Sequence, residues 1–301
     1  MTIREYLLKT YRKSTLNSNL YNIKRFTDYF AGRAEKACYK DILQYLEYLR
    51  KNCDLHPKTL KHCLYAVKIY FNYLLQTGKR KDHPCSELNL KDKINKQIRV
   101  DTLYSEQMLE YFFETLCLSK RKHRLDNRNK IILSLLVYQA LTVTEIVTLT
   151  VSDINLDRGE IFVRVKQFHQ QSRTLPLKAK QIMLFYKYLE QDRPVLLKYN
   201  KSNPSEQTLL LEQYGNKIHP HNISRIINAY RPKNEWIQPL KIRQSVIANL
   251  LKRENNTRII QVFAGHKRVS TTEQYRQNEL ETLQTAVNKY HPLLRLLDNR
   301  Q

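Results

Sequence analysis

The chain has little glycine and no cysteine pattern typical of a metal site or a disulfide framework. Its 301 residues include only five glycines, and a sequence with so little glycine offers few tight turns and favours helices. Its cysteines are odd in number and widely spaced, without a Cys-x-x-Cys pair: Cys38, Cys53, Cys63, Cys85 and Cys117. This usage argues against a disulfide scaffold and a zinc site, and is typical of a reducing cytoplasm.

Long apolar runs and acidic residues are also scarce. No run approaches the length of a membrane span, and the N-terminus "MTIREYLLKTYRK" lacks the apolar region of an export signal. Only 28 Asp and Glu oppose 52 Lys and Arg, which gives a formal charge of +24. Such a surplus repels itself unless a polyanion compensates it, and the cations are spread along the chain. We therefore expect a long groove for double-stranded DNA, with no membrane and no small-molecule substrate; solvated surface lysines are the alternative.

The first third of the chain has apolar residues at helical spacing. This spacing recurs in "LYNIKRFTDYFAG", "YKDILQYLEYLRKN" and "HPKTLKHCLYAVKIYFNYLLQTGKRK", and the third helix should begin near Pro57 and stop at Gly78. The following "HPCSELNLKDKINKQIRVDTL" has no sustained apolar period, which is typical of a linker. These patterns predict an N-terminal helical domain over residues 1–95 and a second domain over 96–301.

The second domain combines helices with a short alternating pair of segments. Ser105 is the expected N-cap of "YSEQMLEYFFETL", and one long apolar helix is expected over "RNKIILSLLVYQALTVTEIVTL". "EIFVRVKQ" and "SRTLPLK" alternate and predict an antiparallel pair joined by the turn "QFHQQ". Helical periods resume in "KQIMLFYKYLEQ", "HPHNISRIINAYR", "PLKIRQSVIANLLKR" and "NTRIIQVFAGH". The predicted fold is mainly α with a small antiparallel β-sheet.

Arg243 occupies the apolar face of one of these helices. Val246 and Ile247 follow at three and four residues, and Leu250 at seven, so the guanidinium starts from the inward side. An inward arginine without an anion is costly, so it needs a carboxylate or a phosphate. Both a buried salt bridge and a phosphate clamp fit this position.

Three segments of the second domain resemble, in order and spacing, the successive boxes of the tyrosine recombinase family, the Xer and phage-integrase group. They are "RNKIILSLLVYQALTVTEIVTL" with the hairpin after it, "PLKIRQSVIANLL", and "VFAGHKRVSTTEQYRQNELETLQTAVNKYHP". Residues 1–95 resemble the family's SAM-like core-DNA-binding domain. The resemblance implies two domains that form a clamp around DNA, as homo- or hetero-tetramers. It also implies strand cleavage and rejoining through a 3'-phosphotyrosyl intermediate, as in integration of a mobile element, without metal or ATP.

The resemblance also assigns roles at the site. Tyr275 matches the nucleophile, His266 and Arg243 match groups that contact the scissile phosphate, and Lys166 matches the lysine that protonates the leaving 5'-oxygen. The transition state carries extra negative charge, so fixed cations are needed around it. Each residue also has an ordinary alternative, namely a packing tyrosine, a polar helix cap, a buried salt bridge and a solvated lysine.

Further residues are candidates for contacts with DNA or with a neighbouring subunit. The DNA candidates are basic residues of the hairpin and of the exit from the first domain: Arg164, Arg173, Lys79, Arg80 and Lys81. The apolar residues Leu280, Leu283, Ala286 and Val287 recur at helical spacing. In the family this segment docks on a neighbouring protomer, although packing on its own domain fits the spacing equally well.

The chain departs from the family pattern at three positions. Thr142 stands where the family has its first arginine, Leu240 replaces the first histidine, and Gln244 follows Arg243 where a histidine is usual. Removing one preorganised donor from a charged transition state costs about 3 kcal/mol, or about a hundredfold in rate.

Two hypotheses are compatible with these departures. In the first, Arg164 or Arg173 compensates and the protein is an active recombinase; in the second, it is a DNA-binding subunit or regulator without strand cleavage. A third hypothesis, a basic helical transcription factor with no recombination history, requires the three matching segments to be a coincidence. The retention of Tyr275, His266 and Arg243 favours the enzyme.

Overall fold

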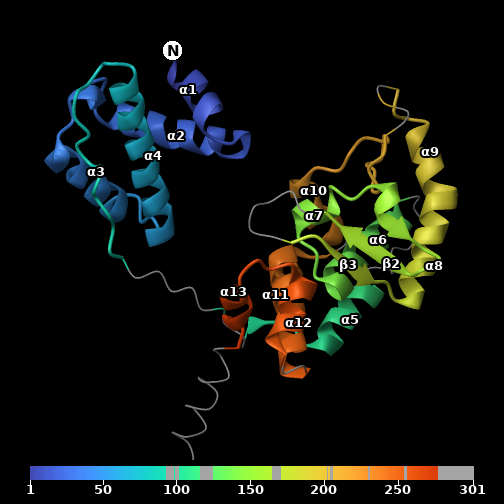
Figure 1. Ribbon diagram of the computed structural model, residues 1–301. Coiled ribbons are helices and arrows are strands. Elements are labelled where there is room, and N and C mark those ends of the chain that lie inside the picture. The colour runs from blue at the N-terminus through green and yellow to red at the C-terminus, as the bar shows by residue number, and fades with distance from the viewer. Residues whose placement is uncertain are drawn as a thin grey trace, which may run out of the picture. The chain divides into compact units, whose positions relative to one another are not determined.

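The chain forms two compact units, residues 1–95 and 96–301, each with a hydrophobic core of its own. The computed structural model describes residues 1–92, 98, 102–115, 125–164, 171–201, 203, 206–229, 231–253 and 256–276. Both units are dominated by helices (Figure 1). Within the described ranges, no helix has the length and apolar character needed to cross a membrane.

Unit 1 is entirely helical in its described part. Its helices are α1 (Ile3–Thr10), α2 (Lys13–Tyr29), η1 (Ala34–Lys36), α3 (Tyr39–Lys51) and α4 (Pro57–Gln76). The three helices predicted from apolar spacing are confirmed, and α4 has Pro57 in its first turn, where the missing N–H costs nothing. The spacing analysis did not predict α1, whose start is fixed by a capping box between Thr2 and Glu5.

Unit 2 contains the rest of the helices and the only described sheet. The helices are α5 (Glu106–Thr115), α6 (Asp126–Gln139), α7 (Val143–Ile146), η3 (Val151–Asp153), α8 (Ala179–Lys187), η4 (Tyr188–Asp192), α9 (Arg193–Leu197), α10 (Pro220–Ile227), η5 (Lys233–Glu235), α11 (Pro239–Arg253), α12 (Thr257–Ala264) and α13 (Val269–Glu273). Ser105 accepts a hydrogen bond from the N–H of Met108 at 3.2 Å, as expected of the predicted N-cap.

The sheet is antiparallel, with the order β1-β2-β3. Its strands are β1 (Ile154–Asn155), β2 (Glu160–Val163) and β3 (Arg173–Pro176). The predicted pair is confirmed as β2 and β3, in which Val163 faces Arg173. The two-residue strand β1 was not predicted, because it is too short to show an alternating pattern.

The single long helix predicted over residues 128–149 is wrong. Helix α6 ends at Gln139 because Ala140 adopts a left-handed conformation, with φ at 49°. The chain restarts as the short helix α7, whose N-cap Thr142 forms a reciprocal capping box with Glu145. The apolar period continues through the break, so periodicity alone could not reveal it. The break turns the carbonyl group of Ala140 toward α11, where it accepts a hydrogen bond from Arg243.

Helix α6 is the centre of unit 2. Helices α5, α8, α10 and α11 all pack against it, and Ile131, Ile132, Leu133, Leu135 and Leu136 are fully buried. Helix α12 packs against α11 and α13 packs against α12, and the three lie together in Figure 1. The end of α6, the face of α11 and the turn after α12 therefore meet in one region of unit 2.

Candidate active site

Arg243 projects from α11 into the interior, as the apolar spacing predicted, and is 6% exposed. Its Nη1 donates to the carbonyl oxygen of Ala140, and its Nη2 donates to the carbonyl oxygen of Ala264 at 2.6 Å. Nη2 also lies 3.2 Å from Nε2 of His266. The ends of α6 and α12 thus hold the guanidinium from two sides, which fixes its orientation.

His266 follows α12, which ends at Gly265 in the left-handed conformation, with φ at 68°. Because an arginine can only donate, Nε2 of His266 must accept from Arg243, and Nδ1–H donates to Oγ1 of Thr272 at 2.9 Å. Burial, together with the charges of Arg243 and Arg173, lowers the pKa of His266 to about 4. His266 is therefore a neutral imidazole with one defined tautomer in the free protein.

Tyr275 lies just after α13 and is half-buried against the core of unit 2. Its ring stacks nearly parallel to that of His266, with centroids 6.5 Å apart and planes at 14°. Burial raises the pKa of Tyr275, and the charge of Arg243 offsets part of this increase. The polar segment after α12 therefore places this phenol beside His266 and within the field of a buried cation.

Glu145 links the remaining groups of the site and was not predicted from the sequence. Its Oε1 accepts from Nη1 of Arg173 at 2.7 Å, and its Oε2 lies 4.0 Å from Nη1 of Arg243. Oε2 also accepts from the backbone N–H of Thr142 at 2.7 Å and from its hydroxyl at 2.8 Å. Burial acts to raise the pKa of Glu145, but Arg173, Thr142 and Arg243 together lower it below its usual value. Glu145 is therefore ionised.

Arg173, which we predicted as a DNA contact on the hairpin, is buried with a side chain only 2% exposed. Its Nε donates to the carbonyl oxygen of Phe263 at 2.7 Å, while its Nη2 is buried without a hydrogen-bond partner among the described residues. A Cβ atom at position 265 would overlap this guanidinium. Glycine is thus required there both by the backbone and by the approach of Arg173.

The structure also describes the three positions that we predicted to depart from the family pattern. Thr142 is half-buried and caps α7. Leu240 is 64% exposed in the first turn of α11, one turn before Arg243, and Gln244 is half-buried. Lys166 and the helical segment with Leu280, Leu283, Ala286 and Val287 lie outside the described residues.

The other basic candidates differ in exposure. Arg164 is half-exposed and donates to Asp153 at 2.6 Å. In unit 1, Lys79 is half-exposed, 3.5 Å from Glu35, and Lys81 is exposed. Arg80 folds inward: it lies over the ring of Phe71 at 5.1 Å and donates to the carbonyl oxygens of Glu35 and Ala37. Arg80 therefore fixes the chain after α4.

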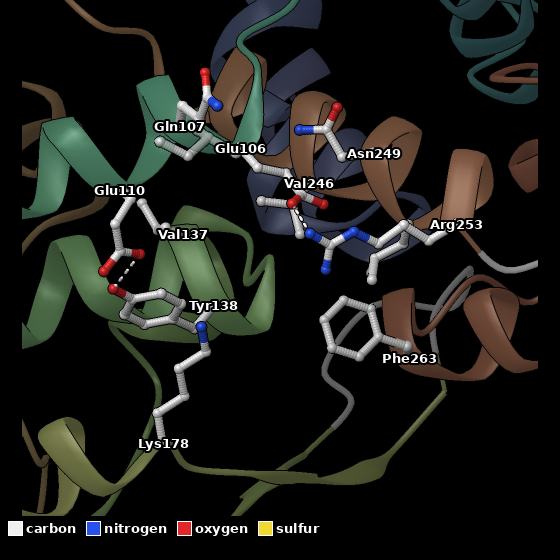
Figure 2. A pocket seen from close by; sticks show the side chains of 12 residues that line it. Glu106, Gln107, Glu110, Val137, Tyr138, Lys178, Val246, Asn249, Arg253 and Phe263 are labelled. Atoms are coloured by element: carbon white, nitrogen blue, oxygen red, sulfur yellow. Dashed lines mark hydrogen bonds and ion pairs between the residues drawn. The ribbon is translucent and has the colours of Figure 1, made fainter.

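A separate groove lies between α5, α6, α11 and α12, with a volume of about 470 Å³. Figure 2 shows Val137, Val246 and Phe263 facing it. Its rim carries the ion pair of Glu106 with Arg253, while Glu110 accepts from the hydroxyl of Tyr138 at 2.8 Å. Within the described ranges, no cluster of His, Cys, Asp and Glu suited to a metal ion is present in either unit.

Both units match known families. Residues 105–281 match the phage integrase family, and residues 2–79 match the phage integrase N-terminal SAM-like domain. The chain is 24% identical over 294 residues to the tyrosine recombinase XerC of Leptospira interrogans serogroup Icterohaemorrhagiae serovar copenhageni. This alignment covers 94% of this chain and 89% of XerC. It is 32% identical over 168 residues to XerD of Staphylococcus epidermidis, 55% of each chain.

Solved structures show the same fold. The site-specific recombinase XerH, bound to its difH substrate, has a TM-score of 0.68 and 19% identity, over 91% of this chain and 79% of that chain. The Tn1549 transposon integrase, in complex with a circular intermediate DNA, has a TM-score of 0.62 and 16% identity, over 94% of this chain and 99% of that chain. Because the family match spans more than half of the sequence, the chain belongs to the phage integrase family, and its function is site-specific DNA recombination of the tyrosine type.

Proposed function

We propose that Tyr275 is the nucleophile that attacks a phosphodiester of bound duplex DNA. The observation that carries this proposal is the convergence of three groups: Arg243 is bonded to His266, and Tyr275 stacks on His266 within the field of Arg243. A tyrosine hydroxyl is a weak nucleophile at its usual pKa, and a nearby fixed cation favours the phenolate.

In the cleavage step, a bond forms between Oη of Tyr275 and phosphorus while the bond from phosphorus to the 5'-oxygen breaks. The phenolic proton is lost to solvent or a base, and the 5'-oxygen takes up a proton, for which Lys166 is the proposed donor. Arg243 binds non-bridging oxygens as negative charge develops on them. The negative charge of the phosphate favours protonation of His266, which would then donate to it as well. Attack by a 5'-hydroxyl on the phosphotyrosyl link reverses the step, so the reaction consumes no ATP.

DNA binding by both units is part of the proposal. The charge of +24 suits a duplex, and the structures of XerH and of the Tn1549 integrase are complexes with difH substrate and with a circular intermediate DNA. The half-exposed Arg164 and Lys79 and the exposed Lys81 are the proposed phosphate contacts. Arg80 has internal partners and is the weakest of these candidates. Such a protein would act in the cytoplasm.

Assembly into a tetramer on DNA is also proposed. The groove of Figure 2 offers an apolar floor, with Val246 and Phe263, for a segment of a neighbouring copy, and its charged rim can orient that segment. The apolar positions from Leu280 to Val287 are the proposed insert. Leu250 lines the same groove and is half-buried, so a Leu250→Glu substitution should reduce the number of protomers per DNA without reducing the binding of one protomer.

The central test is covalent trapping. A site is first selected from a random duplex pool by tight binding of the parent protein, then prepared with a nick that lets the cleaved end diffuse away. The parent should give a protein–DNA adduct on a denaturing gel, and Tyr275→Phe should give none. Tyr214→Phe is the matched control, because Tyr214 is an exposed tyrosine of the same unit and its loss should leave the adduct unchanged.

The second function, a DNA-binding subunit without strand cleavage, has less support. Thr142 and Leu240 are its basis. The contact between Arg243 and His266 and the stacking of Tyr275 on His266 support strand cleavage instead. Tight binding of the selected site without any adduct from the parent would contradict the nucleophile proposal and favour this second function.

A further inference from the structure

The cluster at the site contains two buried cations and one buried anion, and its balance of charge depends on Arg173. Arg243 and Arg173 are both buried, as is Glu145 between them. His266 is neutral because its pKa is about 4. The cluster therefore carries one net positive charge, although the arginine expected at position 142 is replaced by threonine.

Glu145 is not shared equally between the two arginines. Its Oε1 is hydrogen-bonded to Nη1 of Arg173 at 2.7 Å, whereas its closest approach to Arg243 is 4.0 Å. Arg243 donates instead to the neutral carbonyl oxygens of Ala140 and Ala264. The carboxylate is thus neutralised mainly by Arg173, and the charge of Arg243 remains available toward Tyr275.

We propose that Arg173 is a positioning residue that replaces the charge lost at Thr142. It does so by neutralising Glu145, so that Arg243 acts on the scissile phosphate and the phenolate with an uncompensated charge. Without Arg173, Glu145 and Arg243 would form a nearly neutral pair, and the field that stabilises the transition state would be lost. This inference rests on the proposed function of Tyr275 and Arg243.

The surroundings of Arg173 fit this role. The carbonyl oxygen of Phe263 accepts from Nε of Arg173, and Gly265, which has no side chain, leaves room for the guanidinium. Thr142 donates to the other oxygen of the Glu145 carboxylate. The replaced position and Arg173 are therefore linked through one residue. Arg164, the other hairpin candidate, is paired with a different carboxylate, Asp153, at 2.6 Å.

The first experiment removes or moves the charge at position 173. In the full-length protein on the selected nicked duplex, Arg173→Met should slow adduct formation by about a hundredfold or more. Arg173→Lys keeps the charge and should stay within about tenfold of the parent. Binding of the duplex, measured by titration, should change little in both variants, because the side chain of Arg173 is only 2% exposed.

The decisive experiment is a rescue. Arg173→Met leaves Glu145 buried without its closest partner, which destabilises the fold, so the single variant does not suffice. Adding Glu145→Gln removes both charges, restores the net charge of the cluster, and keeps an oxygen that can accept from Thr142, because glutamine also serves in a capping box. The double variant should recover to within about tenfold of the parent. Arg173→Met should shift the pH profile of the rate of adduct formation to higher pH, and the double variant should have the pH profile of the parent again.

Recovery in the double variant, with the pH profile restored, supports the charge role. A double variant that melts like the parent but remains as slow as Arg173→Met overturns it, and so does an Arg173→Met variant as fast as the parent. If the parent itself forms no adduct on its selected site, the proposed function fails rather than this inference.

Discussion

Two regions of unit 2 bury an arginine, and only one of them has the features of an active site. Arg128, at the start of α6, donates from Nη1 to the carbonyl oxygen of Leu211 at 2.8 Å and from Nε and Nη2 to Asn129. Arg243 is equally buried, but it lies beside a histidine, a tyrosine and a second arginine.

The difference lies in the partners of the two arginines, and it is the reason why we propose a catalytic role for Arg243 and a structural role for Arg128. The recorded hydrogen bonds of Arg128 all go to neutral oxygens, those of Leu211 and Asn129. The Arg243 cluster keeps a net charge, and Nη2 of Arg173 is without a partner in the described part of the chain. Burial of a charge is costly in both regions, but only in the second does the buried charge act on the phenol that we propose as the nucleophile.

The largest expected effect comes from removing Arg243, and removal of Arg128 is the comparison. Arg243→Met should lower the rate of adduct formation by about a hundredfold or more, or about 3 kcal/mol in the activation free energy, because the phosphate loses its main donor. Arg128→Met should leave the rate per folded molecule unchanged and should lower the free energy of unfolding by about 1–3 kcal/mol, because the carbonyl of Leu211 is left unsatisfied.

Trapping kinetics and chemical denaturation of both variants would test this contrast. The comparison breaks down if Arg128→Met slows cleavage as much as Arg243→Met while both proteins remain folded. A fall in stability alone for Arg243→Met, with an unchanged rate, would make Arg243 a structural residue like Arg128.

Much of this contrast was accessible from the sequence, but not all of it. The apolar spacing on α11 predicted that Arg243 points inward, and the order of the motifs brought Tyr275 and His266 into the candidate site. Spacing could not reveal that Glu145 belongs to the site. Its capping box with Thr142 joins residues that are close in sequence, whereas its ion pair with Arg173 joins α7 to β3.

The break at Ala140 was missed for a related reason. Its left-handed conformation interrupts an apolar period that the sequence continues, and its carbonyl group gains a partner only when α11 packs against α6. Arg173 shows the same limit: a polar turn predicted an exposed hairpin cation, but contacts with Glu145 and Phe263 bury it. Contacts between segments distant in sequence decide these cases.

A medium effect should appear in the pH dependence of stability. The pKa of His266 is lowered from 6.5 to about 4 in the folded protein, so between these values the unfolded chain binds a proton that the folded one does not. Stability is therefore lost as pH falls from about 6.5 toward 4. Because the ring is partly exposed, we expect a loss of roughly 2 kcal/mol in the unfolding free energy.

Denaturation of the free protein at several pH values would measure this loss. His266→Gln should flatten the curve over this window, whereas the same change at His219, which is exposed, should leave it as steep as in the parent. An equally steep curve for His266→Gln would mean that folding does not lower the pKa of His266, and the neutral imidazole inferred for the free protein would be wrong.

The smallest effect, and the most informative about the cluster, concerns Thr142→Arg. Loss of the N-cap of α7 should cost about 1 kcal/mol of stability, while a guanidinium at this position should raise the rate of adduct formation by about tenfold. This gain is well below the hundredfold usual for a transition-state donor, because Arg173 already supplies the missing charge.

The same substitution should therefore gain more in the Arg173→Met background, where the charge is absent, and trapping kinetics of the four proteins would give the coupling between the two positions. Equal gains in both backgrounds would show that the two arginines act independently. A loss of rate in both would place Thr142 away from the phosphate, and the position of the missing family arginine would have to be sought elsewhere in the chain.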